Sequence, residues 1–300
     1  MIDQADKLRQ LVEGSRAATQ NAVVSVSVKN ARVIAVTSGK GGVGKTNFTV
    51  NLAIQLARRG KKIVIIDADF GLANIDVLFG VVSKHSFADV LSGQIKMRDA
   101  LTDGPLGIQF ISGGSGMSQL ADITENQMSY LLENFAFLDE VADIVLIDTG
   151  AGISKSVVNF VKASQETIIV TTPEPTSVTD AYAIIKTVRE GNENTPLFKL
   201  VVNRVDDAKE GSEIFEKLNM VTQRFLNVTL ENLGAIPYDN RLVQAVKKQR
   251  PVVMAFPDTA SAKSIHIISS KLVQTGIQET TQHKEGVRAF MRRLSGIFGS

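Results

Sequence analysis

The 300-residue chain contains no cysteine, and it has no hydrophobic run long enough to cross a membrane. Without cysteine there can be no disulfide framework, no thiolate metal site and no thiol redox chemistry. A membrane-spanning helix needs about 18 to 20 consecutive apolar residues. The first ten residues, MIDQADKLRQ, also lack the apolar segment of a signal peptide. We therefore expect a cytoplasmic protein.

An excess of charge of one sign is also missing, since 33 lysines and arginines oppose 31 aspartates and glutamates. A net charge of +2 does not indicate a nucleic-acid partner, although basic residues can still gather locally. Hydrophobic residues make up 44% of the chain and charged residues 21%, without a low-complexity tract. These proportions are typical of a globular protein with a large core, and the length is compatible with one main domain.

From Arg32 onward, short β-branched runs alternate with longer segments of helical period. This alternation predicts an α/β fold, a doubly wound and mostly parallel sheet flanked by helices. Near-continuous apolar runs belong to strands that are buried on both faces. The predicted strands are 32–38, 61–67, 108–112, 142–148, 166–172, 197–203 and 233–237, and the predicted helices are 45–59, 124–138, 154–163, 177–190, 208–225 and 260–275.

Two segments lie outside this predicted core. Residues 1–30 begin with a short helical pattern and continue through a Ser/Val-rich linker. Near residue 276 a polar linker begins, which leads to a final apolar and basic segment. We therefore expect a central domain at 31–275 with two short helical appendages, one at 1–30 and one at 276–300.

The segment GKGGVGKT, residues 39–46, directly follows the first predicted strand. It matches the complete P-loop pattern in the strand–loop–helix context that this motif requires. Glycines let backbone N–H groups surround phosphate oxygens, Lys45 can reach the β- and γ-phosphates, and Thr46 can bind Mg²⁺. We therefore expect ATP and Mg²⁺ as cofactors. The residues expected to bind the nucleotide here are Gly39, Lys40, Gly41, Gly42, Val43, Gly44, Lys45, Thr46 and Asn47.

With its additional lysine, Lys40, this motif resembles the deviant Walker A box of the MinD/ParA ATPases, and the resemblance extends over about residues 32–275. It implies a homodimer formed with ATP, because the matching lysine in that family reaches the phosphates of the partner subunit. A second cation near the γ-phosphate also offsets charge in the transition state. In a lone monomer we expect Lys40 to have no partner. The alternative is a solvated loop lysine.

Acidic residues at strand ends extend the resemblance. Asp67 and Asp69 end the second predicted strand, at an edge where α/β folds bind ligands, and Asp148 ends the fourth. The resemblance implies that Asp69 orients the attacking water, while Asp67 and Asp148 hold Mg²⁺. Either Asp67 or Asp69 could instead cap the next helix. The catalytic candidates are Lys40, Lys45, Asp69 and Asp148, and the metal candidates are Thr46, Asp67 and Asp148.

Two later segments are expected to surround the adenine base. The same resemblance implies that Asn203 reads the polar edge of the base, that Arg204 stacks beside its ring, and that Pro237 and Asp239 complete the site. An asparagine at a strand end is more often a turn former, so a structural role for Asn203 stays open. Glu174 and Asp180 match family positions near the dimer interface.

The last segment carries an apolar stripe at helical spacing, flanked by Lys284, Arg288, Arg292 and Arg293. A terminal helix of this kind is typical of a surface membrane anchor. We expect it to bind anionic lipid weakly and reversibly at the inner face of the cell membrane, and more tightly when ATP joins two copies. The alternative is an amphipathic helix packed on its own core. The stripe consists of Val287, Phe290, Met291, Leu294, Ile297 and Phe298.

At the other end, DQADKLR at residues 3–9 matches the DQAxxLR motif of the FlhG group, MinD-like regulators of flagellar number and placement. In that group the segment activates an FlhF-type SRP GTPase, which implies Gln4, Leu8 and Arg9 as partner-binding residues. The resemblance implies a slow regulatory ATPase, with flagellar basal-body components as possible further partners. The alternative interpretation of this segment is a frayed terminal helix.

Other functions use the same scaffold. Within the family, a MinD-type septum-site ATPase and a ParA-type ATPase that partitions DNA or cargo are the alternatives, although we do not expect nucleic-acid binding. Electron-transfer and metalloid-pump relatives need cysteines, so the chain lacks their chemistry. A biotin-pathway type of ligase is compatible with the core but gives neither appendage a purpose. A scaffold that never hydrolyses ATP would not need Asp69 and Asp148.

Overall fold

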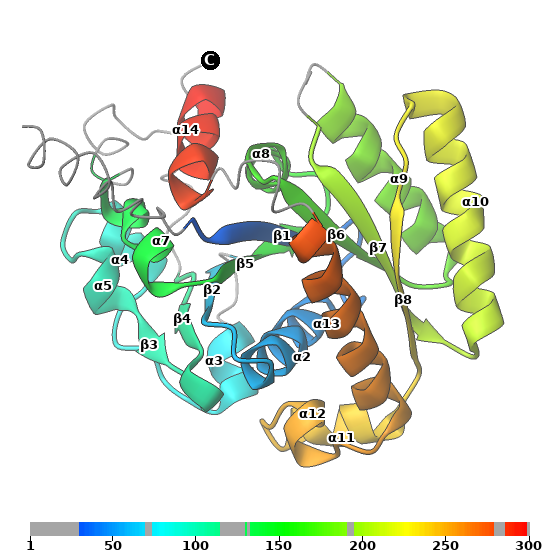
Figure 1. The fold of residues 1–300 in the computed structure, drawn as a ribbon, viewed down its shortest axis with the longest axis horizontal. Helices are drawn as coiled ribbons and strands as arrows, with labels where there is room; N and C mark the ends of the chain where they lie inside the picture. Colours follow the sequence, from blue (N-terminus) through cyan, green and yellow to red (C-terminus); the bar gives the residue numbers. More distant parts are fainter. Residues whose placement is uncertain are drawn as a thin grey trace, which may run out of the picture.

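The computed structural model describes residues 30–69, 74–114, 130, 133–190, 195–278 and 286–298. Its centre is an eight-stranded sheet of order β3-β4-β2-β5-β1-β6-β7-β8 (Figure 1). All neighbouring strands are parallel except β3 and β4. The predicted fold class is therefore confirmed. The strands are β1 (Arg32–Ser38), β2 (Ile63–Ala68), β3 (Thr102–Asp103), β4 (Gln109–Ile111), β5 (Ile144–Ala151), β6 (Glu166–Thr171), β7 (Leu197–Val205) and β8 (Glu231–Pro237).

Helices cover both faces of this sheet (Figure 1). Alternate residues of β1 point to opposite faces, so Ile34 and Val36 pack with the α2 and α13 side, and Val33 and Ala35 with the other side. The helices are α2 (Lys45–Arg58), α3 (Asn74–Phe79), α4 (Phe87–Leu91), α5 (Met97–Ala100), the 3₁₀ turn η1 (Pro105–Gly107), α7 (Leu138–Val141), α8 (Lys155–Ala163), α9 (Pro175–Arg189), α10 (Ala208–Leu226), α11 (Asn240–Lys247), α12 (Val252–Ala255), α13 (Ala260–Gln278) and α14 (Gly286–Phe298).

The strand predictions agree with the structure more closely than the helix predictions. All seven predicted strands occur, and 32–38 coincides with β1. Sequence analysis missed β3, α3, α4, α5 and α12, which are too short to show a clear hydrophobic period, and also α11, which does carry apolar residues at helical spacing. The predicted helix at 124–138 lies largely outside the described residues. Its end is helical at 133–136 and is separated by a turn at Phe137 from α7.

The terminal helix α14 lies on the core, beside α8 and near α7 and β1 (Figure 1). Val287, Phe290, Met291 and Leu294 are almost fully buried, and the Phe290 ring stacks on Phe160 with centroids 6.3 Å apart. Burying each such side chain contributes about 1.5–3 kcal/mol before the cost of ordering the helix. The apolar stripe is thus covered by the protein itself in this structure.

The two predicted appendages differ in how much of them the structure describes. Ile297 is partly buried against the same core, while Arg288 and Arg292 are exposed on the outer side of α14. The side chain of Phe298, and the candidate partner residues Gln4, Leu8 and Arg9, lie outside the described part. No described helix is long and apolar enough to span a bilayer.

A buried group of charges joins the amino ends of four strands. Lys199 of β7 is fully buried and forms ion pairs with Glu231 and, at 3.5 Å, with Glu166. Glu166 also pairs with Arg32, whose guanidinium donates to the carbonyl oxygen of Leu272 at 2.6 Å. Each charge therefore has an opposite charge beside it, which offsets the cost of burial.

Replacing Lys199 with methionine should lower the free energy of unfolding by about 3 kcal/mol, because Glu231 loses its described cation and the buried Glu166 keeps only Arg32. The matched control is Lys209→Met. Lys209 is 84% exposed, and its ion pair with Glu213 is long, with 3.7 Å between Nζ and Oε1. We expect that change to cost less than about 1 kcal/mol. Urea unfolding of both variants makes the comparison, and equal losses would contradict the role given to the buried network.

Candidate nucleotide-binding site

Residues 39–46 pass from the end of β1 into α2, and two of their glycines are packed closely against other parts of the chain. A Cβ on Gly39 would lie 2.3 Å from the carbonyl carbon of Asp180 in α9. Gly44 has a φ of 94°, and a Cβ there would lie 2.6 Å from Nδ2 of Asn203. Glycine is therefore required at both positions, by close packing at Gly39 and by backbone conformation as well at Gly44.

Lys45 lies at the start of α2 and meets the aspartate that ends the hydrophobic run of β5. Its Nζ donates to Oδ1 of Asp148 at 3.0 Å, and Thr49 Oγ1 donates to the same atom at 2.9 Å. Lys45 Nζ also lies 3.4 Å from Thr46 Oγ1. The structure thus brings together the lysine, threonine and aspartate that sequence analysis selected from two distant segments.

Asp67 and Asp148 lie opposite each other on the neighbouring strands β2 and β5, and both are fully buried. In each, Oδ2 has no hydrogen-bond partner among the described residues. Burial, and then the charge of Asp148, raise the pKa of Asp67 to about 8. Adjacent carboxylate oxygens of this kind suit a hard divalent cation. The group therefore fits Mg²⁺, which Thr46, Asp67 and Asp148 would hold.

Asp69 lies at the edge of this acidic pair. Its backbone N–H donates to Oδ1 of Asp67 at 3.1 Å, and its own carboxylate points toward Gly150, where a Cβ would lie 3.8 Å from Oδ1. The ends of β2 and β5 thus bring the predicted water-orienting acid next to Gly150, near the carboxyl end of β5. Residues 70–73, which follow Asp69, lie outside the described part.

Lys40 has a partner within its own chain. Its Nζ lies 2.7 Å from Glu174 Oε2 and 3.2 Å from Thr176 Oγ1, at the start of α9. The expectation that Lys40 is unpaired in a monomer is therefore wrong, because Glu174, 134 residues away, is brought beside it. The two side chains are 41% and 56% exposed. The hydrogen bond from Lys40 lowers the pKa of Glu174.

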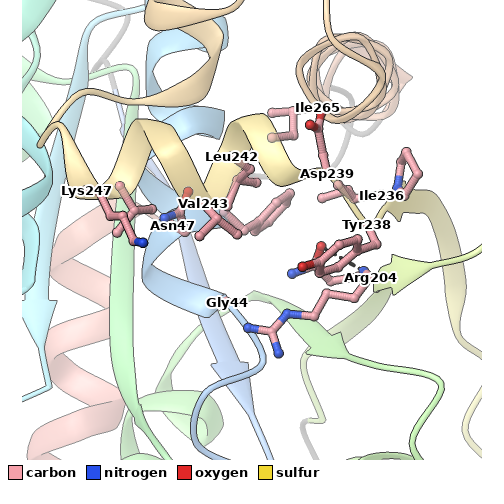
Figure 2. A pocket seen from close by; sticks show the side chains of 14 residues that line it. Gly44, Asn47, Arg204, Ile236, Tyr238, Asp239, Leu242, Val243, Lys247 and Ile265 are labelled. Carbon is pink, nitrogen blue, oxygen red and sulfur yellow. Dashed lines mark hydrogen bonds between the residues drawn. The ribbon is translucent and has the colours of Figure 1, made fainter.

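A cleft of about 550 Å³ lies between α11 and the ends of β7 and β8. Figure 2 shows the side chains of α11 on one side of it and Arg204 and Tyr238 on the other. Such a mostly apolar cleft beside a P-loop suits a flat base. Its lining residues are Gly44, Asn47, Phe48, Asn203, Arg204, Ile236, Pro237, Tyr238, Asp239, Leu242, Val243, Val246, Lys247 and Ile265.

Sequence analysis identified fewer than half of these residues. It selected Gly44 and Asn47 with the P-loop, and Asn203, Arg204, Pro237 and Asp239 by resemblance. It missed the α11 wall and Tyr238. The spacing of the α11 residues Leu242, Val243 and Val246 directly after the GAIPYD segment is a helical signal that could have indicated this wall.

Asn203 and Arg204 hold the P-loop in place. The Asn203 amide donates to Val43 O at 2.7 Å, and its Oδ1 accepts from the Arg204 N–H at 3.0 Å. Arg204 has a φ of 61°, and its guanidinium donates to Gly42 O at 2.7 Å. A positive φ at a non-glycine residue costs free energy and is common at binding sites. The structural role left open for Asn203 is thus present, and contact with a base stays a prediction.

Asp239 lines the cleft, but its carboxylate is used within the protein. Oδ1 accepts from the Arg241 N–H at 2.8 Å and so caps α11, while Oδ2 accepts from Ser261 Oγ at 2.7 Å. Burial by itself raises the pKa of Asp239, but the hydrogen bonds from Ser261 and from backbone N–H groups outweigh it, so the net pKa is lowered. Asp239 therefore joins α11 to α13 at one wall of the cleft.

A P-loop at the carboxyl edge of a parallel sheet, with its lysine bound to a buried aspartate, defines the class of P-loop nucleoside triphosphatases. A family model described as "ParA: NUBPL iron-transfer P-loop NTPase" matches residues 29–273. The chain therefore belongs to the ParA/MinD family of P-loop NTPases. Iron transfer through cysteine thiolates is not possible for this member, because it has no cysteine.

Relatives in bacteria and archaea share this core. Antiactivator FleN of Pseudomonas aeruginosa is 43% identical over 246 residues, which cover 82% of this chain and 88% of FleN. Flagellum site-determining protein YlxH of Helicobacter pylori is 36% identical and covers 90% and 92% of the two chains. The cell division ATPase MinD of Pyrococcus furiosus has a TM-score of 0.68 at 25% identity, covering 82% of this chain and 99% of MinD.

Asp67 makes stability depend on pH when Mg²⁺ is absent. Its pKa rises from an ordinary 3.8 to about 8 on folding, so the folded state binds the extra proton and stability falls as pH rises between these values. Asp67→Asn cannot ionise and should not show this loss. Urea unfolding in a chelator should show the variant gaining about 2–4 kcal/mol relative to wild type between pH 5 and pH 8. A constant difference would contradict the assignment.

Proposed function

We propose that the protein is an ATP-dependent, dimerising switch that regulates flagellar number and placement, as an FlhG-type ATPase. The observation that carries this proposal is Lys40, which stands at the rim of a complete P-loop in an ion pair with Glu174 that is open to solvent. The relative named flagellum site-determining protein YlxH, which covers 90% of this chain, supports the flagellar role. Relatives named putative septum site-determining protein MinD make septum placement the second candidate, because the same switch would serve it.

The residues of the site have separate roles in the proposed hydrolysis. Bound Mg²⁺–ATP supplies the phosphoryl group that is transferred to water. Lys45 and the amides of the P-loop bind phosphate oxygens, and Asp69 accepts a hydrogen bond from the water. The backbone bond from Asp69 to Asp67 links the water-orienting acid to the cation-binding pair. Slow turnover suits a regulator, since the lifetime of the ATP state sets the duration of its signal.

Dimerisation would exchange one ion pair for another. Lys40 must leave Glu174 in order to reach the phosphates of a second copy. An exposed pair such as this contributes little to stability, so ATP in the partner subunit can compete for the lysine. Glu174 and Asp180 both lie beside the P-loop, and their place near the dimer interface stays a prediction.

Two variants should separate dimerisation from hydrolysis. Lys40→Ala should bind ATP but remain monomeric, because the contact to the partner's phosphates is lost. Asp69→Ala should dimerise and lose at least about 100-fold in turnover, because no acid orients the water. Sedimentation velocity with ATP and Mg²⁺, together with phosphate release, measures both properties. Normal dimerisation of Lys40→Ala, or normal turnover of Asp69→Ala, would contradict the assigned roles.

Membrane binding would require α14 to leave the core. Its buried face, from Val287 to Leu294, cannot touch lipid while it packs on Phe160 and its neighbours. The exposed Arg288 and Arg292 can still attract an anionic surface from the docked position. We propose that ATP-dependent dimerisation favours the released helix, since two helices bind one membrane with avidity.

Sedimentation with anionic vesicles tests this switch. The full chain should bind with ATP and much less with ADP or without nucleotide, whereas a chain that ends at Gln282 should not bind under any condition. Neutral vesicles are the control for the electrostatic contribution, which salt should also weaken. Equal binding by the shortened chain, or no binding by the full chain, would remove the membrane role and leave α14 as a core helix.

The N-terminal segment adds a partner to this proposal. The DQAxxLR motif supports contact with an FlhF-type SRP GTPase through Gln4, Leu8 and Arg9. Either a polar side chain or an arginine supplied in trans can complete a nucleotide site of another protein. The segment leads to Ala31, the residue directly before β1.

A further inference from the structure

Asp139 on α7 is only 4% exposed, yet no described lysine or arginine forms an ion pair with it. Its carboxylate is held by backbone N–H groups instead. Oδ1 accepts from Ala31 at 2.9 Å and from Val287 at 2.8 Å, and Oδ2 accepts from Arg288 at 3.3 Å. These donors come from the two ends of the described chain, so Asp139 ties both ends to the core.

The contact with α14 has the chemistry of a helix cap. The first N–H groups of a helix have no partner within it and favour negative charge. Asp139 supplies that charge from a position 148 residues away in sequence. Gly286, with a φ of 67°, permits the close approach, because a Cβ there would lie 2.9 Å from Asp139 Oδ1 and 3.0 Å from Asn30 Cβ.

We propose that Asp139 is a latch that holds α14 on the core and couples it to the start of β1. The inference rests on the proposed membrane function in one respect, namely that release of α14 exposes a lipid-binding face. Because a single oxygen accepts from both Ala31 and Val287, a displacement of the chain at Ala31 that shifts the Asp139 carboxylate also shifts the acceptor of Val287. A partner that binds the segment before Ala31 could therefore promote release of the tail.

The latch differs in kind from the apolar contacts around it. The stripe of α14 can exchange the protein surface for lipid and bury similar apolar area in both places. The bonds from the Val287 and Arg288 N–H groups to Asp139 have no such replacement in apolar lipid, and their loss leaves Ala31 as the remaining described donor to the carboxylate. The apolar stripe therefore stabilises both the helix docked on the core and the helix bound to lipid, while the bonds to Asp139 set how readily the helix leaves the core.

Two variants disturb the latch from opposite sides. Asp139→Asn keeps the shape but replaces one acceptor oxygen with an N–H donor, so at least one bond is lost. Gly286→Ala introduces a Cβ into the space beside the carboxylate and at a positive φ. The matched control is Glu140→Gln, because Glu140 is the exposed neighbour of Asp139 on the same helix.

Hydrogen exchange without nucleotide measures the latch directly. In both variants the amides of Val287 and Arg288 should exchange about 10-fold faster or more, and that of Ala31 should also accelerate, while Glu140→Gln matches wild type. Unchanged ATP binding by each variant shows that the core is folded. If both variants fold and their amides exchange at wild-type rates, the latch is overturned. If the amides of Val287 and Arg288 exchange faster but that of Ala31 does not, the coupling between α14 and the start of β1 is overturned.

Vesicle sedimentation of the same variants separates this inference from the proposed function. Nucleotide-free binding to anionic vesicles should rise several-fold in Asp139→Asn and Gly286→Ala. Faster exchange without any vesicle binding would support the latch and refute the membrane role. If Asp139→Asn does not fold, Gly286→Ala and its exchange rates decide the question, since that change leaves the carboxylate in place.

Discussion

The buried ion pair between Lys45 and Asp148 is the interaction on which the arrangement of the site depends. It joins the first residue of α2 to β5 at 3.0 Å, and Thr49 donates to the same oxygen. With β1 and β2 on either side of β5, this bond brings the P-loop and Asp67 to one edge of the sheet. Removing either charge would leave the other buried and unpaired, which costs more than the pair contributes.

Two further contacts hold the parts that move in the proposed switch, and they differ in burial. The Lys40–Glu174 pair is exposed, so its loss costs little, and in the proposed dimer a second subunit would replace it. The Asp139 contacts are buried, so release of α14 would leave polar groups to be hydrated. In the proposed switch, this difference in cost would place dimerisation before membrane attachment.

Membership of a family does not by itself decide which reaction a protein can carry out. The matching family model is named for iron transfer, whereas this chain has no cysteine and carries an apolar and basic terminal helix. The shared core carries the P-loop, and in the proposed function the added segments decide what the nucleotide state controls.

The sequence by itself determined the parallel α/β core and the phosphate-binding loop. Strand runs such as 32–38 and the motif at 39–46 are continuous in the chain, so local pattern is sufficient to identify them. The acids Asp67 and Asp148 were also predictable, since strands of a parallel sheet end at one edge.

Only the tertiary structure decided which distant residues meet. Glu174 is 134 residues from Lys40, and Asp139 is 108 and 148 residues from Ala31 and Val287, so no local pattern indicates these contacts. The sequence also does not decide where α14 lies, because an apolar stripe of period 3.6 suits a lipid surface and a protein groove equally well. Packing against Phe160 and capping by Asp139 place the helix on the core.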